Sequence, residues 1–143
     1  VQALYHGYVN RRKLTDDEKA LEKTYSLLLN LANKEKAVSN GLFFDLMYAN
    51  QDVSLFNPSK QYAFMRKCAN EVLLVVVNFA QEDAECSVCL PRHAFEYLEI
   101  PEKTVTASDL LSKEETLSVD LKAESVIRMS VPGLGGRVYK FTV

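Results

Sequence analysis

The spacing of the hydrophobic residues changes at Gly41, and from there to the C-terminus it has a period of two. Near the C-terminus, for example, Leu117, Val119 and Leu121 alternate with polar neighbours. Successive side chains of a β-strand point to opposite faces of its sheet, so this alternation is typical of strands with one buried face. The pattern therefore predicts a mainly β fold from this glycine onward.

The alternation divides into seven or eight short segments that we expect to be strands. They lie at residues 43–48, 62–67, 71–80, 84–90, 104–107, 116–121, 127–131 and 139–143. Segment 71–80 is apolar on both faces, which indicates a central strand covered on both sides. Turn signals between the segments predict an antiparallel Greek-key β-sandwich, in which residues 132–136 form a hairpin loop between the last two strands. One or two helical turns are expected at residues 92–98.

One long α-helix is predicted before the strands. Thr15 and Glu18 have the spacing of a capping box, in which a hydroxyl and a carboxylate satisfy the free amide groups at a helix start. The residues that follow are good helix formers and include neither Gly nor Pro. We expect this helix to run from Asp16 to about Lys36.

The apolar stripe of this helix is wider than one neighbouring surface requires. It covers about 200° of the helix circumference, whereas a helix lying on a single surface needs about 100°. We therefore expect the helix to pack between two surfaces, of which the sandwich supplies one; the alternative is a helix buried deep in one small domain. Without the second surface, one of two sets of side chains is uncovered. These sets are Leu27, Leu31 and Ala20, or Leu29 and Tyr25.

An uncovered apolar side is expected to be hidden, because monomers rarely expose large apolar patches. We expect either a homo-oligomer formed through this helix or a lid formed by residues 1–12. The apolar residues of that lid are Tyr5, Tyr8 and Val9. The chain then has two parts: an N-terminal segment with the helix, residues 1–39, and a C-terminal β-sandwich domain, residues 40–143.

The charge and hydropathy of the chain exclude two classes of partner. A net charge of −2 gives no electrostatic reason to expect nucleic acid or an anionic membrane. No apolar run approaches the roughly 20 residues that span a bilayer. The chain begins with Val1, without a basic stretch and a following apolar stretch. We expect a fragment with cut ends, and the sequence indicates no compartment.

The residue types that carry catalysis form no recognisable constellation. His6 and His93 lack a Ser or Cys partner pattern, so we expect surface histidines. The carboxylates are expected in the first turn of the helix or in solvated turns. They are Asp16, Asp17 and Glu18; Glu82, Asp83 and Glu85; and Glu114 and Glu115. We predict no catalytic, cofactor-binding or metal-binding residue in this chain.

Two short motifs suggest chemistry that their context does not support. Cys86 and Cys89 have the C-x-x-C spacing of zinc and redox sites, but residues three apart in a strand point to opposite faces and no second pair completes four ligands. We expect free thiols that bind no metal, with Cys68 as the third. The glycines within residues 133–136 precede a strand rather than a Lys-Ser and a helix, so turn geometry is expected rather than phosphate binding.

The aromatic residues comprise seven Tyr, seven Phe and no Trp. Sugar-binding modules stack sugar rings on exposed flat aromatic side chains, above all on Trp. Most Phe and Tyr residues here fall on inward-pointing strand positions, which favours a core role. Tyr5, Tyr8 and Tyr48 are the least committed, and a sugar platform among them is the less expected interpretation.

Four segments follow one another in an order that is informative. The first, at residues 13–48, is a predicted helix followed by a glycine turn into a strand: KLTDDEKALEKTYSLLLNLANKEKAVSNGLFFDLMY. The second, at residues 62–91, contains an aromatic-Arg strand, a Val-Val-Val-Asn-Phe strand and a strand that ends in Leu-Pro: YAFMRKCANEVLLVVVNFAQEDAECSVCLP. DLLSKEETLSVDL and VPGLGGRVYKFTV complete the order. Together they resemble the end of glycoside hydrolase family 13, the α-amylase family, whereas residues 1–12 do not align.

The resemblance implies a non-catalytic C-terminal β-domain preceded by the last helix of a catalytic barrel that is absent from the chain. It implies a parent enzyme that hydrolyses or transfers α-glucosidic links with retention, and the barrel as the partner of this domain. The family's three catalytic carboxylates lie in barrel strands before this helix, so none is expected here and the chain alone should have no glycosidase activity. The alternative function is an independent carbohydrate- or protein-binding β-sandwich module.

Overall fold

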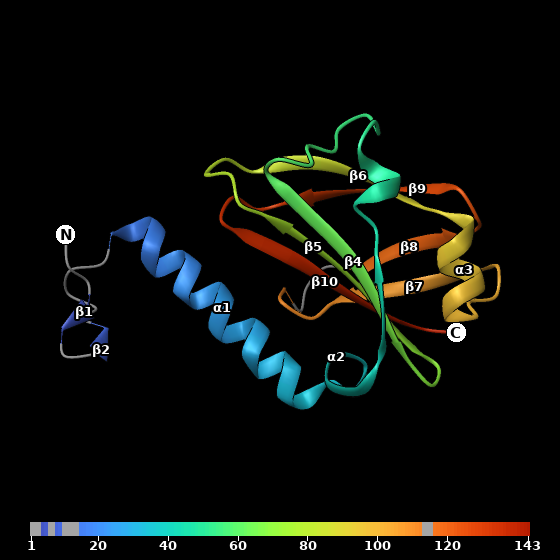
Figure 1. Ribbon diagram of the computed structural model, residues 1–143, viewed down its shortest axis with the longest axis horizontal. Helices are drawn as coiled ribbons and strands as arrows, with labels where there is room; N and C mark the ends of the chain where they lie inside the picture. Colours follow the sequence, from blue (N-terminus) through green and yellow to red (C-terminus); the bar gives the residue numbers. More distant parts are fainter. Residues whose placement is uncertain (1–3, 6–7, 10–14, 113–115) are drawn as a thin grey trace.

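The computed structural model describes residues 4–5, 8–9, 15–112 and 116–143, and within them the side chains of residues 4–5 and 8–9 and of part of the long helix are left out. Two antiparallel sheets face each other, and the long helix runs past one side of them (Figure 1). The fold is mainly β, as predicted from the period of two.

The larger sheet has six strands in the order β3-β4-β5-β10-β7-β8, and the smaller sheet pairs β6 with β9. The strands are β3 (Leu42–Asp45), β4 (Gln61–Cys68), β5 (Glu71–Asn78), β6 (Ala84–Leu90), β7 (Lys103–Asp109), β8 (Thr116–Leu121), β9 (Ser125–Val131) and β10 (Gly135–Thr142). The last strand returns to lie between β5 and β7, and the chain crosses between the sheets before and after β6 and β9. These crossings give the predicted Greek-key sandwich, with eight strands in its described part.

Strand β5 is covered on both faces, as its apolar run predicted. Val72, Leu74 and Val76 point into the main core between the two sheets. Leu73 and Val75 point to the other face of the large sheet, where they belong to a second buried cluster. We call this second face the outer face, because the helices that precede the sandwich pack on it.

The prediction of a hairpin loop at residues 132–136 is wrong. β9 pairs with β6, whereas β10 pairs with β5 and β7, so the loop carries the chain from the small sheet to the large one. Gly133 N donates to Asp83 Oδ1 at 2.8 Å, and Leu134 N donates to the Ala80 carbonyl at 2.8 Å. The loop is therefore bound to the β5–β6 connection, which is a contact that strand periodicity cannot reveal.

The first predicted strand of the sandwich, residues 43–48, is shorter than expected. Met47 N donates to Asp45 Oδ1 at 2.7 Å, and this local bond turns the chain out of β3. A 3₁₀ turn, η2 (Tyr48–Asn50), follows. Tyr48 therefore lies on a turn at the edge of the sheet rather than in a strand.

The N-terminal helix occupies nearly the expected residues. Helix α1 is Asp16–Lys34, and a short helix, α2 (Lys36–Asn40), continues the chain to Gly41. Thr15 Oγ1 accepts from Glu18 N at 3.2 Å, which is the N-cap half of the predicted capping box. The Glu18 carboxylate accepts from the Thr15 hydroxyl at 3.1 Å, not from the Thr15 backbone amide that a complete capping box uses. None of the helices in the described residues has the length and apolarity needed to cross a membrane.

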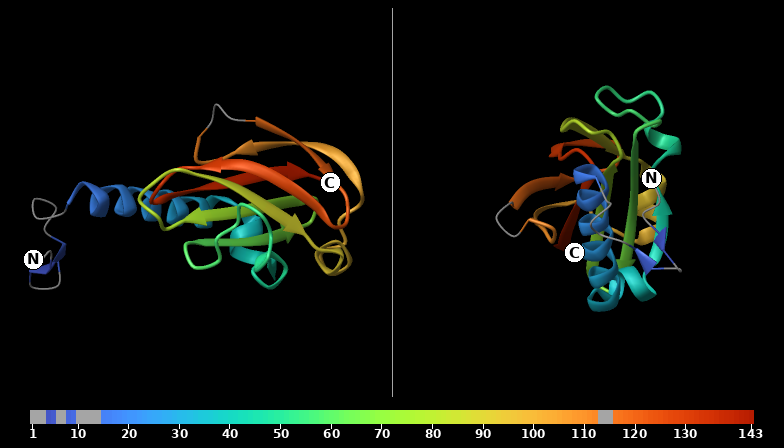
Figure 2. Two further views of the ribbon diagram at one scale, coloured as in Figure 1. Left: turned by 90° about the horizontal axis from the view of Figure 1, so that it is seen from above. Right: turned by 90° about the vertical axis from the view of Figure 1, so that its left-hand side faces the viewer.

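Helix α1 projects past the sandwich. Its C-terminal part lies beside the large sheet, and its N-terminal part extends beyond it (Figures 1 and 2). Leu29 is 64% exposed, and the side chains of the other residues in the two predicted uncovered sets, Leu27, Leu31, Ala20 and Tyr25, lie outside the described residues. Strands β1 (Leu4–Tyr5) and β2 (Tyr8–Val9) lie beyond the end of α1 rather than along it, so the expected lid is not the arrangement in the structure.

Candidate functional site

A hollow of about 700 Å³ lies beside the edge strand β3. Its lining residues are Phe43, Phe44, Asp45, Tyr48, His93, Glu96 and Tyr97. Tyr48 and Tyr97 are 56% and 54% exposed. The centroid of the Phe44 ring lies 6.1 Å from that of Tyr48 and 5.9 Å from that of Tyr97. We call Phe44, Tyr48 and Tyr97 the edge aromatic cluster.

Asn50 fixes the turn that carries Tyr48. Its side chain is fully buried, and its Nδ2 donates to the Leu46 carbonyl at 2.7 Å and to the Cys89 carbonyl at 3.1 Å. Its Oδ1 accepts from Cys89 N at 2.7 Å. The side-chain amide therefore satisfies the backbone groups of β6 that a further strand would otherwise pair.

Tyr97 is positioned by helix α3 (Arg92–Leu98), which forms where one or two helical turns were expected. One face of α3 is buried in the core, and the opposite face lines the hollow. The buried residues are Ala94, Phe95 and Leu98, and the exposed ones in the hollow are His93, Glu96 and Tyr97. Glu124 Oε1 accepts from Arg92 N at 2.8 Å and so satisfies a free amide at the start of this helix.

The hollow contains acidic and aromatic groups and no Lys or Arg among its lining residues. Burial raises the pKa of Tyr48, and the nearby Glu124 and Cys89 raise it further, so its phenol is a neutral hydroxyl at physiological pH. The rings give an apolar floor, and the carboxylates of Asp45 and Glu96 give acceptors at the rim. Such a surface fits an uncharged molecule with apolar faces and hydroxyl donors.

The histidines do not form a catalytic pair in the described residues. His93 lies on the exposed face of α3, and no hydrogen bond joins it to a described Ser or Cys. His6 lies outside the described residues, as do Glu114 and Glu115.

The described members of the three predicted carboxylate groups lie at the surface, as expected. Asp16 and Glu18 are exposed in the first turn of α1, and the side chain of Asp17 lies outside the described residues. Glu82, Asp83 and Glu85 are also exposed. Asp83 holds the 132–136 loop, and Glu85 Oε2 lies 3.7 Å from Arg128 Nε. Each group therefore has a structural role or a solvated position.

The C-x-x-C pair is divided between two environments, as strand alternation predicts. Cys86 is fully buried in the main core, whereas Cys89 is half-buried, and both are free thiols, as is Cys68. Burial raises the pKa of Cys86, and Glu85 raises it further, so this thiol is a poor nucleophile. Within the described residues, no three His, Cys, Asp or Glu side chains are grouped to hold a metal ion.

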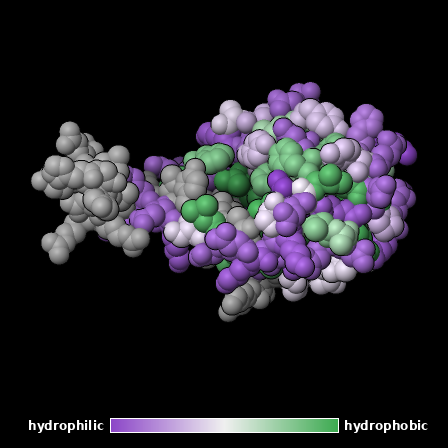
Figure 3. Space-filling model, turned by 60° about the horizontal axis from the view of Figure 1, so that its bottom comes forward, coloured by the Kyte–Doolittle hydropathy of each residue, from purple (hydrophilic) through white to green (hydrophobic). Residues whose placement is uncertain are grey.

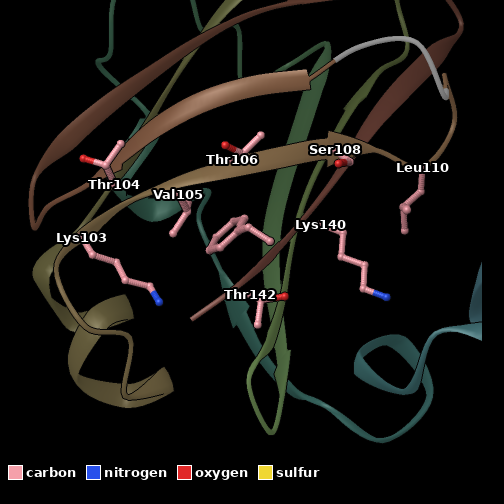
Figure 4. A pocket seen from close by; sticks show the side chains of 9 residues that line it. Lys103, Thr104, Val105, Thr106, Ser108, Leu110, Lys140 and Thr142 are labelled. Carbon is pink, nitrogen blue, oxygen red and sulfur yellow. The ribbon is translucent and has the colours of Figure 1, made fainter.

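A second hollow, of about 530 Å³, lies where β7 and β10 separate (Figure 4). These strands pair only at Tyr139–Asp109 and Lys140–Ser108. Threonine and serine hydroxyls line the hollow between Lys103 and Lys140. Lys140 Nζ already binds Glu35 Oε2 at 2.8 Å and Glu71 Oε1 at 3.4 Å. Of the two lysines that line the hollow, Lys140 is therefore already paired with carboxylates.

The outer face of the large sheet carries a row of aromatic rings beside the helices. Ring centroids of Phe43 and Phe64 lie 5.3 Å apart, and those of Phe64 and Tyr62 lie 5.7 Å apart. Arg66 stacks over Phe43 and donates to the Ala37 carbonyl at 2.9 Å and the Gly41 carbonyl at 2.7 Å. This arginine closes the end of α2 and joins it to the sheet. We call Phe43, Phe64 and Tyr62 the outer aromatic row.

Sequence reasoning singled out Tyr48 but missed Phe44 and Tyr97. The side chains of Tyr5 and Tyr8, its other two tyrosines, lie outside the described residues. A sequence signal for Tyr97 did exist: His93 and Tyr97 are four residues apart and so share one face of a helix, opposite the face that carries the buried Phe95. Phe44 could not be found in this way, because only the tertiary fold brings β3 next to α3.

The comparisons with known proteins cover more than half of the chain in each case. A family model described as "Alpha amylase, C-terminal all-beta domain" matches residues 55–142, which is more than half of the chain. No curated protein matches the sequence. The structure is similar to that of a noncanonic maltogenic α-amylase from Thermotoga neapolitana, with a TM-score of 0.58 and 17% identity over 96% of this chain and 28% of that chain.

Two further solved structures are similar in fold. The first is an α-amylase from Anoxybacillus, with a TM-score of 0.52 and 16% identity over 94% of this chain and 25% of that chain. The second is α-galactosidase I from Mortierella vinacea, with a TM-score of 0.51 and 16% identity over 90% of this chain and 29% of that chain. This chain therefore spans between a quarter and a third of the length of these enzymes. Because the family model covers residues 55–142, the chain belongs to the family of α-amylase C-terminal all-β domains.

Proposed function

We propose that this chain is the C-terminal part of an α-amylase-family glycosidase acting on α-glucans or related oligosaccharides, and that it stabilises the catalytic barrel of that enzyme. In this proposal residues 1–39 contribute the last barrel helix and residues 40–143 form the accessory sandwich. The observation that carries it is α1, a long helix that lies beside the sandwich by only part of its length and leaves Leu29 64% exposed. The family membership and the similar α-amylase structures support the choice of parent enzyme.

The outer face gives the barrel a second area of contact. The outer aromatic row is only partly buried, with Phe43 42% exposed, and it lies on the same sheet face as α2. Seen from the lower side of Figure 1, hydrophobic groups gather on the sandwich and are bordered by hydrophilic ones (Figure 3). Partly exposed apolar surface of this kind marks interaction sites. A barrel packed here would cover α1 and the Phe64 and Tyr62 rings of this row, while Phe43 borders the hollow at the edge of the sheet.

The first test compares two exposed positions of α1 in the complete coding region and in the 143-residue chain. In the monomeric 143-residue chain, Leu29→Glu and Asn30→Glu each change the free energy of unfolding by at most about 0.5 kcal/mol, because both positions are exposed. In the complete protein, Leu29→Glu is expected to cost about 2–4 kcal/mol, since it places a charge where a leucine is buried. Asn30→Glu is the control and should remain near zero.

The complete protein should also release reducing sugar from soluble starch. A coding region without a barrel, or equal effects of Leu29→Glu and Asn30→Glu in the complete protein, contradicts the proposal. An inactive complete protein with the docking effect intact contradicts only the substrate class.

In the chain alone, a second copy is the proposed cover for α1. Burial of apolar surface at about 25 cal/mol per Å² provides the driving force for such self-association before association costs are subtracted. Sedimentation should then show a monomer–dimer equilibrium that Leu29→Glu shifts toward monomer. A monomer at all concentrations contradicts the homo-oligomer but leaves the barrel contact untouched.

A further inference from the structure

We propose that the edge aromatic cluster binds an α-glucan chain directly. The choice of a carbohydrate comes from the hollow itself, and the choice of α-linked glucose rests on the proposed function. The chain would then contact substrate through its sandwich in addition to supporting the barrel.

The cluster is built so that its rings are rigid and yet exposed. Phe44 packs against the main core, and it contacts Tyr48 on one side and Tyr97 on the other. Asn50 anchors the turn of Tyr48, and the buried face of α3 anchors Tyr97. More than half of each tyrosine nevertheless remains exposed. Rigid aromatic rings held in water lose little conformational entropy when a ligand stacks on them.

The polar groups of the hollow complement a sugar. A glucose unit presents C–H groups on its faces, which pack on aromatic rings, and hydroxyl groups at its rim, which donate hydrogen bonds. Asp45 uses Oδ1 to accept from Met47 N, and no described donor contacts its Oδ2 or the Glu96 carboxylate. These carboxylate oxygens are available acceptors beside the rings.

Two other classes of occupant fit less well. An anionic ligand would meet Asp45 and Glu96 with no Lys or Arg in the lining. A protein segment that covered the hollow would withdraw the rim carboxylates of Asp45 and Glu96 from water, which costs free energy unless the segment pairs both of them. A neutral, hydroxyl-rich chain avoids both penalties.

The test is a titration of the 143-residue chain with maltoheptaose, followed by isothermal calorimetry and saturation-transfer NMR. Tyr48→Ala and Tyr97→Ala are each expected to raise the Kd about tenfold, because each removes one stacking ring. Phe79→Ala is the matched control: Phe79 is 56% exposed but does not line the hollow, so its loss should leave the Kd unchanged. Far-UV circular dichroism confirms that each variant is folded. Cellohexaose, with β-links, is expected to bind at least tenfold more weakly.

Absence of saturable maltoheptaose binding overturns the inference, as does binding that both tyrosine variants leave intact or that Phe79→Ala weakens equally. Equal binding of cellohexaose overturns the commitment to α-linked glucose. The tests of the proposed function use Leu29 and starch hydrolysis and involve no residue of the hollow. If maltoheptaose does not bind but the Leu29 and starch tests succeed, the sugar surface alone is refuted. If maltoheptaose binds but the Leu29 and starch tests fail, the barrel proposal alone is refuted.

Discussion

Replacing Asn50 by alanine is expected to destabilise the sandwich far more than a single polar substitution at the surface. Asn50 is fully buried, donates two hydrogen bonds and accepts one. The alanine variant leaves the Cys89 N–H and two backbone carbonyls without these partners. An unsatisfied buried donor or acceptor costs about 1–3 kcal/mol, and partial relaxation and water entry reduce the sum. We expect Asn50→Ala to lower the free energy of unfolding by about 2–4 kcal/mol.

The control lies one residue further along. Gln51 donates from Nε2 to the Met47 carbonyl at 2.9 Å, which resembles the bond from Asn50 to Leu46, but Gln51 is exposed. Water replaces its partner, so Gln51→Ala should change stability by at most about 0.5 kcal/mol. Urea unfolding followed by circular dichroism and tyrosine fluorescence measures both variants. If the two variants differ by less than about 1 kcal/mol, the role given to the buried amide at the edge of β6 is wrong.

Three further predictions concern ionisation, thiols and activity. The pKa of Lys140 is raised above its ordinary 10.5, chiefly by its hydrogen bond to Glu35. The stability from this contact is therefore complete below pH 10.5 and is lost as pH rises through the folded-state pKa. Urea unfolding from pH 9 to 12 should show that the free energy of unfolding declines less steeply for Lys140→Met than for the unmodified chain, and equal slopes would contradict this. In the folded chain, alkylation should leave Cys86 unmodified at pH 8 because it is fully buried, and elemental analysis should find no stoichiometric zinc; rapid labelling of Cys86 or one equivalent of zinc would refute the assignment of structural thiols. The purified 143-residue chain should release no product from starch or an aryl α-glucoside, and turnover above the buffer background would overturn the non-catalytic assignment.

Local patterns predicted most of the sandwich because they report which face of each strand is buried. The double-sided burial of β5 followed from six consecutive apolar residues, and the start of α1 followed from its capping box. Fold class and strand positions depend on this information, which short windows of sequence contain.

Connections between strands depend on distant contacts, and there the predictions were less accurate. The loop after β9 looked like a hairpin because it is short and rich in glycine. Its bonds to Asp83 and Ala80, some 50 residues earlier, direct it to the other sheet instead. The end of β3 was misplaced for a different reason: the local bond from Met47 N to Asp45 Oδ1 ends the strand although the alternation continues.

The candidate site was predictable only in part. Tyr48 stood out because it had no clear core position, but its neighbours Phe44 and Tyr97 are brought together by tertiary structure. The absence of Trp argued against sugar binding at the level of composition. Composition does not report where aromatic rings gather. The Phe44 ring lies 6.1 Å from that of Tyr48 and 5.9 Å from that of Tyr97, and the three rings together provide the apolar area that a single tryptophan would.

Amide hydrogen exchange of α1 tests the central claim most directly, because that claim assigns the uncovered side of this helix to a catalytic barrel. The amides of Asp16–Lys34 should be followed in the 143-residue chain and in the protein from the complete coding region. We predict that exchange in the N-terminal half of α1 is at least about 100-fold slower in the complete protein, equivalent to about 2.7 kcal/mol of added protection. Equal exchange rates in the two proteins would contradict the account, because they would show that nothing packs on the side of the helix that the sandwich leaves open.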